Sequence, residues 1–183
     1  MISTAHQRLR DATREDHQRL EDRVAILNRV RTPEGRRRLV EDFSGFHRDV
    51  EAAIAPWVAD LEALDFEARR RSTYLARDLV TVGGRAPGAQ VIRVGGVGEA
   101  LGMLYVLEGS TLGGRVLRKQ VDDMTGLSFL DPYGEAVGER WRSFLAVIAG
   151  HARPPADTEA LVAGAVAGFR HAEHRLCETQ VDG

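Results

Sequence analysis

Apolar side chains recur at helical spacing along nearly the whole sequence, and this pattern limits the chain to helical folds. Between residues 4 and 30, the apolar positions at this spacing are Leu9, Ala12, Leu20, Val24 and Leu27. No segment alternates apolar and polar residues for long enough to predict a sheet. We therefore predict one all-α domain that spans residues 1–183.

Start and stop signals divide this domain into helices. The predicted helices span residues 4–30, 33–54, 65–82, 97–124, 134–150 and 157–180. Thr32 and Pro33 have the residue types of an N-cap and a first helical position. Pro56 is expected to interrupt the second helix, and the Pro154-Pro155 pair to separate the last two. Residues 83–96 and 126–133 are predicted loops.

Charge and composition exclude several classes of protein. The chain carries 25 basic and 27 acidic residues, which argues against a nucleic-acid binder that relies on bulk charge. Cys177 is the single cysteine, and no apolar run approaches the roughly 20 residues that span a bilayer. We expect a soluble, cytoplasmic protein with neither a nucleic-acid nor a membrane partner.

Three familiar motifs fail on inspection. The glycine spacing from Gly109 to Gly114 fits a phosphate-binding loop, but Arg115 and Val116 follow where lysine and Ser/Thr are needed. None of the six histidines has glutamate three residues before it, as the Glu-x-x-His pairs of a di-iron bundle require. The sequence also lacks the HExxH motif of zinc proteases.

The first helix carries a group of polar residues on one face. Arg10, Thr13, His17 and Glu21 are separated by 3, 4 and 4 residues, so a helix aligns them. A carboxylate one turn from a histidine can orient its ring, and neutral imidazole is a good iron ligand. The same pattern also fits a solvated helix face with a chance His–Glu pair.

A later helical segment contains an unusual concentration of glycine. Gly109, Gly113 and Gly114 fall within six residues, although each glycine costs roughly 1 kcal/mol inside a helix. One explanation is a kinked helix whose bare backbone approaches a flat ligand. The alternatives are close helix–helix packing, or two helices with a turn between them.

Together the two segments describe a flat ligand held between a histidine-bearing helix and a glycine-bearing helix, a geometry that fits a metalloporphyrin. At these segments, LRDATREDHQRLE and YVLEGSTLGGRVL, the sequence resembles the haem oxygenase family. The two segments most resemble those of the bacterial branch that supplies biliverdin to bacteriophytochromes. WRSFLAVI and AVAGFRHAEHRLCE extend the resemblance over most of the chain.

The resemblance implies a helical bundle with haem b between the proximal first helix and the glycine-kinked distal helix. Haem would be both substrate and cofactor, cleaved with O₂ and electrons from a ferredoxin or reductase to biliverdin, CO and Fe²⁺. A redox partner protein is thus implied, and a bacteriophytochrome could receive the product. By resemblance, the haem-binding residues are Arg10, Thr13, His17, Glu21, Tyr105, Arg142 and Phe169, with His17 on the iron, and the distal residues are Gly109, Ser110, Gly113 and Gly114.

Within this set, Arg10 and Arg142 match positions that face the haem propionates, and Phe169 matches an aromatic that closes on the haem. Ser110 stands where many family members have an aspartate that organises water around bound O₂. A hydroxyl can still hold a water. This departure leaves open a haem-binding or haem-trafficking protein without turnover, and a reuse of the fold for another small molecule is a third reading.

Overall fold

The computed structural model describes residues 4–152 and 155–178, and within them it is helical with no strand. The α-helices are α1 (Thr4–Val24), α2 (Ile26–Arg29), α3 (Pro33–Val58), α4 (Ser72–Val82), α5 (Val97–Arg118), α6 (Val137–His151) and α7 (Pro155–Glu173), and a π-helical turn η5 (His174–Glu178) follows α7. Short 3₁₀ turns are η1 (Glu62–Leu64), η2 (Glu67–Arg69), η3 (Ser128–Leu130) and η4 (Gly134–Ala136). The all-α prediction is confirmed. None of the described helices combines the length and apolarity that a bilayer crossing requires.

Two helix boundaries follow directly from local chemistry. The Thr32 side chain accepts a hydrogen bond from the Gly35 N–H at 3.0 Å, and Pro33 occupies the first helical position, as predicted. Gly83 ends α4 with φ of 66°, a left-handed conformation that favours glycine. Residues 84–95 then form the predicted irregular segment.

Other boundaries differ from the sequence prediction. Ala25, with φ of 45°, separates α1 from α2 within the expected helix 4–30. Pro56 lies inside α3 and does not interrupt it, because it removes a single donor two residues before the helix ends. The helix expected from residue 65 begins only at Ser72, since the backbone N–H of Arg71 is bound by the Glu51 carboxylate at 2.6 Å.

The glycine-bearing helix is continuous. α5 runs from Val97 to Arg118 without a turn, which excludes the alternative of two separate helices. It ends six residues earlier than predicted, and in the segment that follows Asp123 accepts a hydrogen bond from the Thr125 N–H at 2.9 Å. Such a local side-chain bond competes with helical pairing.

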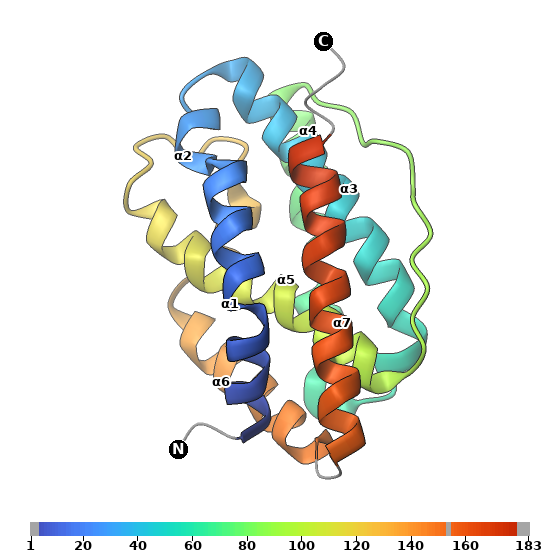
Figure 1. The fold of residues 1–183 in the computed structure, drawn as a ribbon. Coiled ribbons are helices and arrows are strands. Elements are labelled where there is room, and N and C mark those ends of the chain that lie inside the picture. Colours follow the sequence, from blue (N-terminus) through green and yellow to red (C-terminus); the bar gives the residue numbers. More distant parts are fainter. Residues whose placement is uncertain (1–3, 153–154, 179–183) are drawn as a thin grey trace.

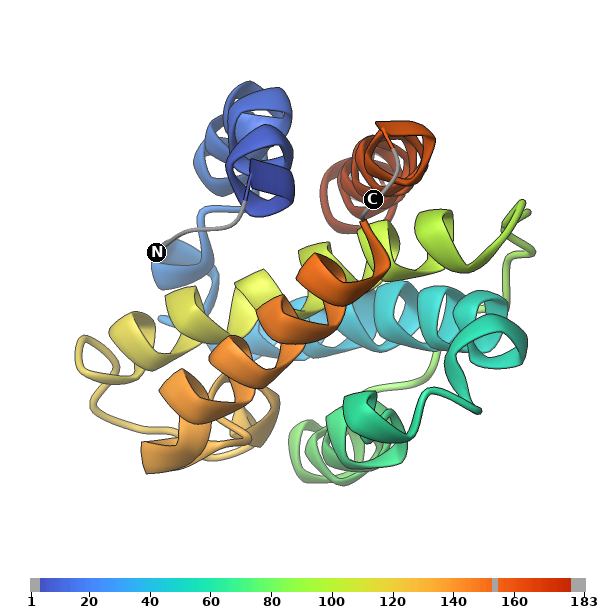
Figure 2. The same ribbon diagram turned by 90° about the horizontal axis from the view of Figure 1, so that it is seen from below.

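The helices are arranged in tiers. Figure 2 shows α1 and α7 above α5, with α3 next to α5, α6 running obliquely below α5, and α4 on the side away from α1. Figure 1 shows α1 and α7 running side by side across the front of α5. The apolar core is one connected cluster to which α1, α3, α4, α5, α6 and α7 all contribute.

Glycines bring α5 and α7 into backbone contact. A Cβ on Gly102 would overlap the Leu161 carbonyl oxygen, and a Cβ on Gly164 would overlap the Glu99 carbonyl oxygen. Each helix thus occupies space that a side chain on the other would need. This close approach fixes α7 against the N-terminal half of α5.

A buried ion cluster holds the opposite side of α5. The Glu108 carboxylate accepts hydrogen bonds from the Arg69 guanidinium at 2.6 Å and the Tyr133 hydroxyl at 2.8 Å. Arg71 lies 3.5 Å from the same carboxylate. Arg69, Arg71 and Glu108 are each at most 3% exposed, so these charges are compensated inside the protein.

Replacing Arg69 with alanine is expected to destabilise the fold by about 3–5 kcal/mol, because it leaves the Glu108 charge buried without its main partner. Urea denaturation of the purified variant measures this loss. The matched control is Arg38→Ala, which removes an exposed pair with Glu34 and should cost under about 1 kcal/mol. Equal losses in the two variants would show that the buried cluster has no special role.

Candidate functional site: the facing surfaces of helices α1 and α5

The histidine-bearing face of α1 is partly open to solvent at His17. The His17 side chain is 54% exposed, and its Nδ1 lies 3.7 Å from Oε2 of Glu21. The Phe169 ring of α7 meets the imidazole edge-on with the ring centres 6.0 Å apart. His17 therefore has a carboxylate on one side and an aromatic wall on the other, and it remains accessible to a ligand.

Thr13 shares the face of His17 but is placed in the core. Its side chain is buried, and its hydroxyl donates to the Leu9 carbonyl of its own helix at 2.8 Å. That arrangement is packing within α1, and a role for Thr13 in ligand binding stays a prediction.

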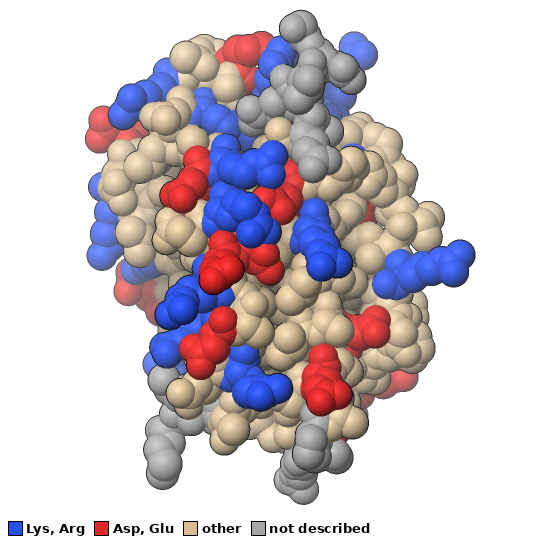
Figure 3. Space-filling model, viewed as in Figure 1, with Lys and Arg blue, Asp and Glu red and all other residues tan. Residues whose placement is uncertain are grey.

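Ion pairs fix α1 to α7. Glu173 accepts hydrogen bonds from Arg19 at 2.7 Å and Arg23 at 2.9 Å. These arginines hold the pKa of the Glu173 carboxyl below its usual range, with Arg19 the larger influence. On the face drawn in Figure 3, basic and acidic side chains alternate over α1. The pairs place α1 beside α7, which itself is seated on α5.

The C-terminal half of α5 presents an open glycine face. Helical geometry puts Gly102, Gly109 and Gly113 on one side of the helix. α7 covers that side at Gly102, but a Cβ added at Gly109 or Gly113 would meet nothing within 4 Å. Leu112 and Val116 flank the open backbone with 36% and 58% of their surface exposed. The combination is a bare backbone strip bordered by apolar side chains.

Gly114 and Ser110 are placed differently. A Cβ on Gly114 would overlap the Leu130 carbonyl oxygen, so this glycine allows the close approach of η3. It faces away from the open strip. Ser110 is exposed, and its hydroxyl donates to the Leu107 carbonyl at 2.6 Å. Its oxygen lone pairs remain available as acceptors.

At the N-terminal end of α1, Arg10 lies near Tyr105 of α5. Burial raises the pKa of the Tyr105 phenol, and the positive charge of Arg10 acts against this rise. The Tyr105 ring packs against Trp141 at 5.6 Å and His6 at 6.1 Å between ring centres. Arg10 itself is 60% exposed, with its Nε 3.9 Å from the equally exposed Asp11 carboxylate, so a ligand can reach its guanidinium.

Arg142 lies apart from these residues. Its side chain is exposed on α6, with Nη1 3.5 Å from the position of a Cβ on Gly138. Within residues 4–152 and 155–178 its guanidinium forms no ion pair. The structure thus brings His17, Glu21 and Phe169 together, and Arg10 with Tyr105, while it does not connect Arg142 to either group.

The sequence analysis did not identify the buried charged residues that hold α5 on the side opposite the open strip. Glu108 directly precedes Gly109, and its carboxylate is buried in the cluster with Arg69 and Tyr133. A signal was present, because Glu108 follows the apolar run from Met103 to Leu107. A carboxylate in such a run requires a buried partner.

A comparison with known proteins finds a relative of this chain. A curated haem oxygenase from Xanthomonas campestris pv. campestris (strain 8004) is 33% identical over 125 residues, which cover 66% of this chain and 76% of that protein. No model of a known protein family matches the sequence.

Solved structures agree on the fold. The haem oxygenase from Neisseria meningitidis, whose NO- and CO-bound forms have been crystallised, superposes with a TM-score of 0.83 at 22% identity, covering 100% of this chain and 96% of that one. The haem oxygenase from Leptospira interrogans superposes with a TM-score of 0.73 at 16% identity, covering 93% and 97%.

Gly114 should respond to alanine differently from Gly109 and Gly113. Gly109→Ala and Gly113→Ala are each expected to raise the stability of the ligand-free protein by up to about 1 kcal/mol, because both positions are helical and face open space. Gly114→Ala is expected to lower it by about 1–3 kcal/mol through the clash with Leu130. Chemical denaturation of the three variants measures these differences. A loss of stability at Gly109 or Gly113 would show that the strip is already packed.

Proposed function

The chain belongs to the haem oxygenase family, and on that premise we propose that it binds haem between α1 and the open strip of α5 and cleaves it to biliverdin, CO and Fe²⁺. The reaction uses O₂ and electrons from an external donor, a ferredoxin or a reductase. The observation that carries this proposal is the accessible His17 imidazole on α1, a helix that lies over α5 (Figures 1 and 2), together with the bare, apolar-edged stretch of α5. A flat, largely apolar ligand with a metal centre matches both halves of that site.

His17 supplies the iron ligand in this proposal. Because Nδ1 faces the Glu21 carboxylate, Nε2 is the nitrogen left for the metal. Glu21 orients the ring and favours the tautomer with its proton on Nδ1. A neutral imidazole would leave the iron without the electron push of a thiolate, so the O–O bond would not be forced to break before oxygen is transferred to the porphyrin edge.

The α5 strip sets how closely the ring can approach. At Gly109 and Gly113 there is no side chain, so the porphyrin plane can lie against the helix backbone. Leu112 and Val116 exclude water from the edges beside it. A face closed in this way leaves a limited part of the ring perimeter reachable, and we propose that this selects the meso carbon that is attacked.

The Ser110 side chain can bind a water molecule beside the strip. Since its hydroxyl hydrogen is bound to the Leu107 carbonyl, the Ser110 oxygen accepts a hydrogen bond from a water and does not donate one. We propose that a water held in this way replaces the aspartate-organised water of other family members. The proton then comes from the water and not from the side chain.

Basic side chains orient the ligand in its plane. Arg10, beside Tyr105, is the cation best placed for a propionate among the two arginines that the family pattern indicates. Arg142 would have to extend from α6 to take part. We further propose that the protein acts in the cytoplasm with a redox partner, and that its biliverdin can supply a bacteriophytochrome.

Spectroscopy of the haem-loaded protein tests the proposal. Wild-type protein with one equivalent of haemin should show a shifted Soret band, and an electron donor in air should convert it to a red-absorbing bile pigment. His17→Ala should weaken haem binding and reduce pigment formation at least tenfold, because the iron loses its protein ligand. The matched control is His151→Ala, at the end of α6, which should behave as wild type.

Chromatography of the extracted pigment identifies the product. Biliverdin that forms in the wild type and depends on His17 supports the assignment. A stable Soret band that survives reduction in air would instead indicate a haem-binding protein without turnover. No Soret shift at all would refute haem as the ligand.

A further inference from the structure

The part of α1 that carries His17 has few contacts with the protein core. The buried residues of α1 are Ala5, Leu9, Thr13 and Val24. Between them lies the His17 stretch, residues 14–23, in which no residue is buried. Burial of apolar surface therefore fixes the helix on either side of this stretch but not the stretch itself. The position of His17 over α5 depends on contacts of another kind.

The helix breaks directly after the His17 stretch. Ala25 follows α1 with φ of 45°, a left-handed conformation that is strained for a residue with a side chain. The next helix, α2, is only four residues long. No longer helix runs past the C-terminal end of the His17 stretch to stiffen it.

One residue of α7 attaches the His17 stretch through ion pairs. Oε1 of Glu173 accepts hydrogen bonds from Nε of Arg19 at 2.7 Å and from Nη1 of Arg23 at 2.9 Å. Its Oε2 accepts a longer bond from Nη2 of Arg19 at 3.3 Å. Only 16% of the Glu173 side chain is exposed, whereas both arginines are nearly half exposed. A sheltered carboxylate bonded to two arginines makes a stronger contact than a single exposed pair.

Glu173 itself lies on an anchored part of the chain. The buried carboxylate of Asp49, on α3, accepts a hydrogen bond from Nε of Arg175 at 2.8 Å. Nε2 of His171 lies 3.1 Å from the same carboxylate. His171 and Arg175 flank Glu173 in the sequence, and Ala172 between them is fully buried in the core. Of the two helices that the ion pairs join, α1 is therefore the one that can move.

From these contacts we propose that Glu173 is a positioning residue for the haem site: through Arg19 and Arg23 it holds the His17 stretch over α5 and slows the release of haem. The inference rests on the proposed function, because it concerns haem bound to His17. Haem held between α1 and α5 can leave when the His17 stretch moves away from α5, and that motion separates Glu173 from both arginines. Because the arginines are nearly half exposed, dissolved salt screens the pairs, and release becomes faster as ionic strength rises.

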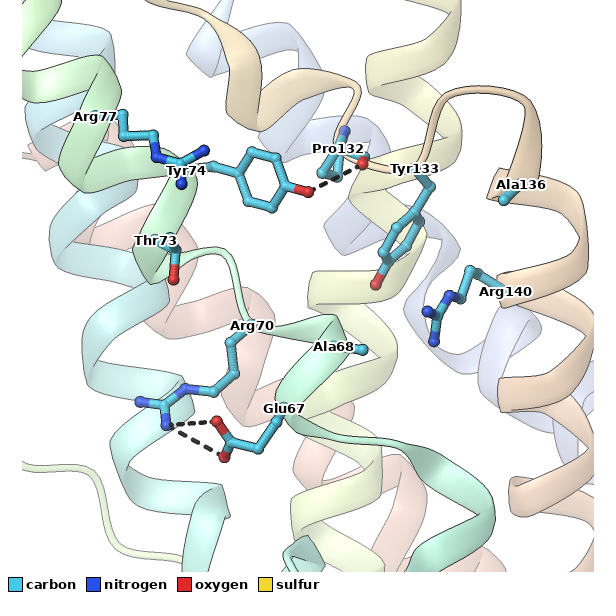
Figure 4. Close-up of a pocket in the computed structure, with 10 residues that line it drawn as sticks. All are labelled: Glu67, Ala68, Arg70, Thr73, Tyr74, Arg77, Pro132, Tyr133, Ala136 and Arg140. Carbon is cyan, nitrogen blue, oxygen red and sulfur yellow. Dashed lines mark hydrogen bonds and ion pairs between the residues drawn. The ribbon is translucent and has the colours of Figure 1, made fainter.

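Hydrogen exchange of the haem-free protein tests the attachment itself. In Glu173→Gln the backbone amides of residues 14–23 should exchange about fivefold faster than in wild type, because local opening no longer breaks the ion pairs. The matched control is Glu67→Gln, which makes the same charge change at an exposed carboxylate bonded to Arg70 in η2 (Figure 4). It should leave this exchange unchanged. Equal exchange in wild type and Glu173→Gln would overturn the inference, whatever the protein does with haem.

Transfer of haem to an excess of apomyoglobin tests the effect on release. Glu173→Gln should lose haem about fivefold faster than wild type at low ionic strength, and Glu67→Gln should match the wild type. The difference should vanish in about 1 M NaCl, where the Debye length is about 3 Å. A purely structural role would not change the salt dependence, so parallel salt dependences in wild type and Glu173→Gln would contradict the proposal. A wild type that shows no Soret shift with haemin would instead refute the proposed function, and this inference with it.

A combined variant shows whether Glu173 acts through the two arginines. Arg19→Gln with Arg23→Gln should release haem as fast as Glu173→Gln does. Adding Glu173→Gln to this pair should change nothing further, because the partners of the carboxylate are already gone. A further acceleration in the triple variant would show that Glu173 acts by another route, which contradicts the proposal.

A destabilised variant separates positioning from general stability. Asp78→Asn alters a buried carboxylate of α4 that accepts hydrogen bonds from the N–H groups of Ser128 and Phe129, so it should lower the melting temperature without touching α1 or α7. Its haem release should match the wild type. Release rates that follow the melting temperature, and not the ion pairs of Glu173, would contradict the positioning role.

Discussion

The backbone contact between α5 and α7 determines the arrangement of the other helices around the site. At Gly102 and Gly164 each helix lies where a side chain of the other would be, so neither can rotate or withdraw without losing the contact. α7 then carries Phe169 to the His17 ring and Glu173 to the arginines of α1. The position of His17 is thus a consequence of glycine packing one helix away.

The opposite side of α5 is fixed by charge. Glu108 is bonded to Arg69 and Tyr133 in the protein interior, and these residues come from segments on either side of α5 in the sequence. With one face held by α7 and another by this cluster, the sector at Gly109 and Gly113 is left open. Open glycines inside a helix reduce stability, and the haem surface that we propose here gives a physical reason for keeping them.

Much of this architecture could be predicted from the sequence, because helical periodicity, the Thr32 cap and the Gly83 stop are local signals. The break at Ala25 could not be, since alanine rarely adopts positive φ and no glycine marks the position. The face shared by His17 and Glu21 follows from spacing alone. The different environments of Gly109 and Gly114 do not, because they depend on where Leu130 returns to α5. Buried Arg69 likewise depends on tertiary packing.

The crystal structure of the haem-loaded protein tests the central claim most directly. The account predicts iron bound by Nε2 of His17, with the porphyrin plane against the backbone at Gly109 and Gly113. It also predicts that Gly114 stays in contact with Leu130, away from the ligand. Iron bound by another histidine, or haem seated away from the open strip of α5, would contradict it.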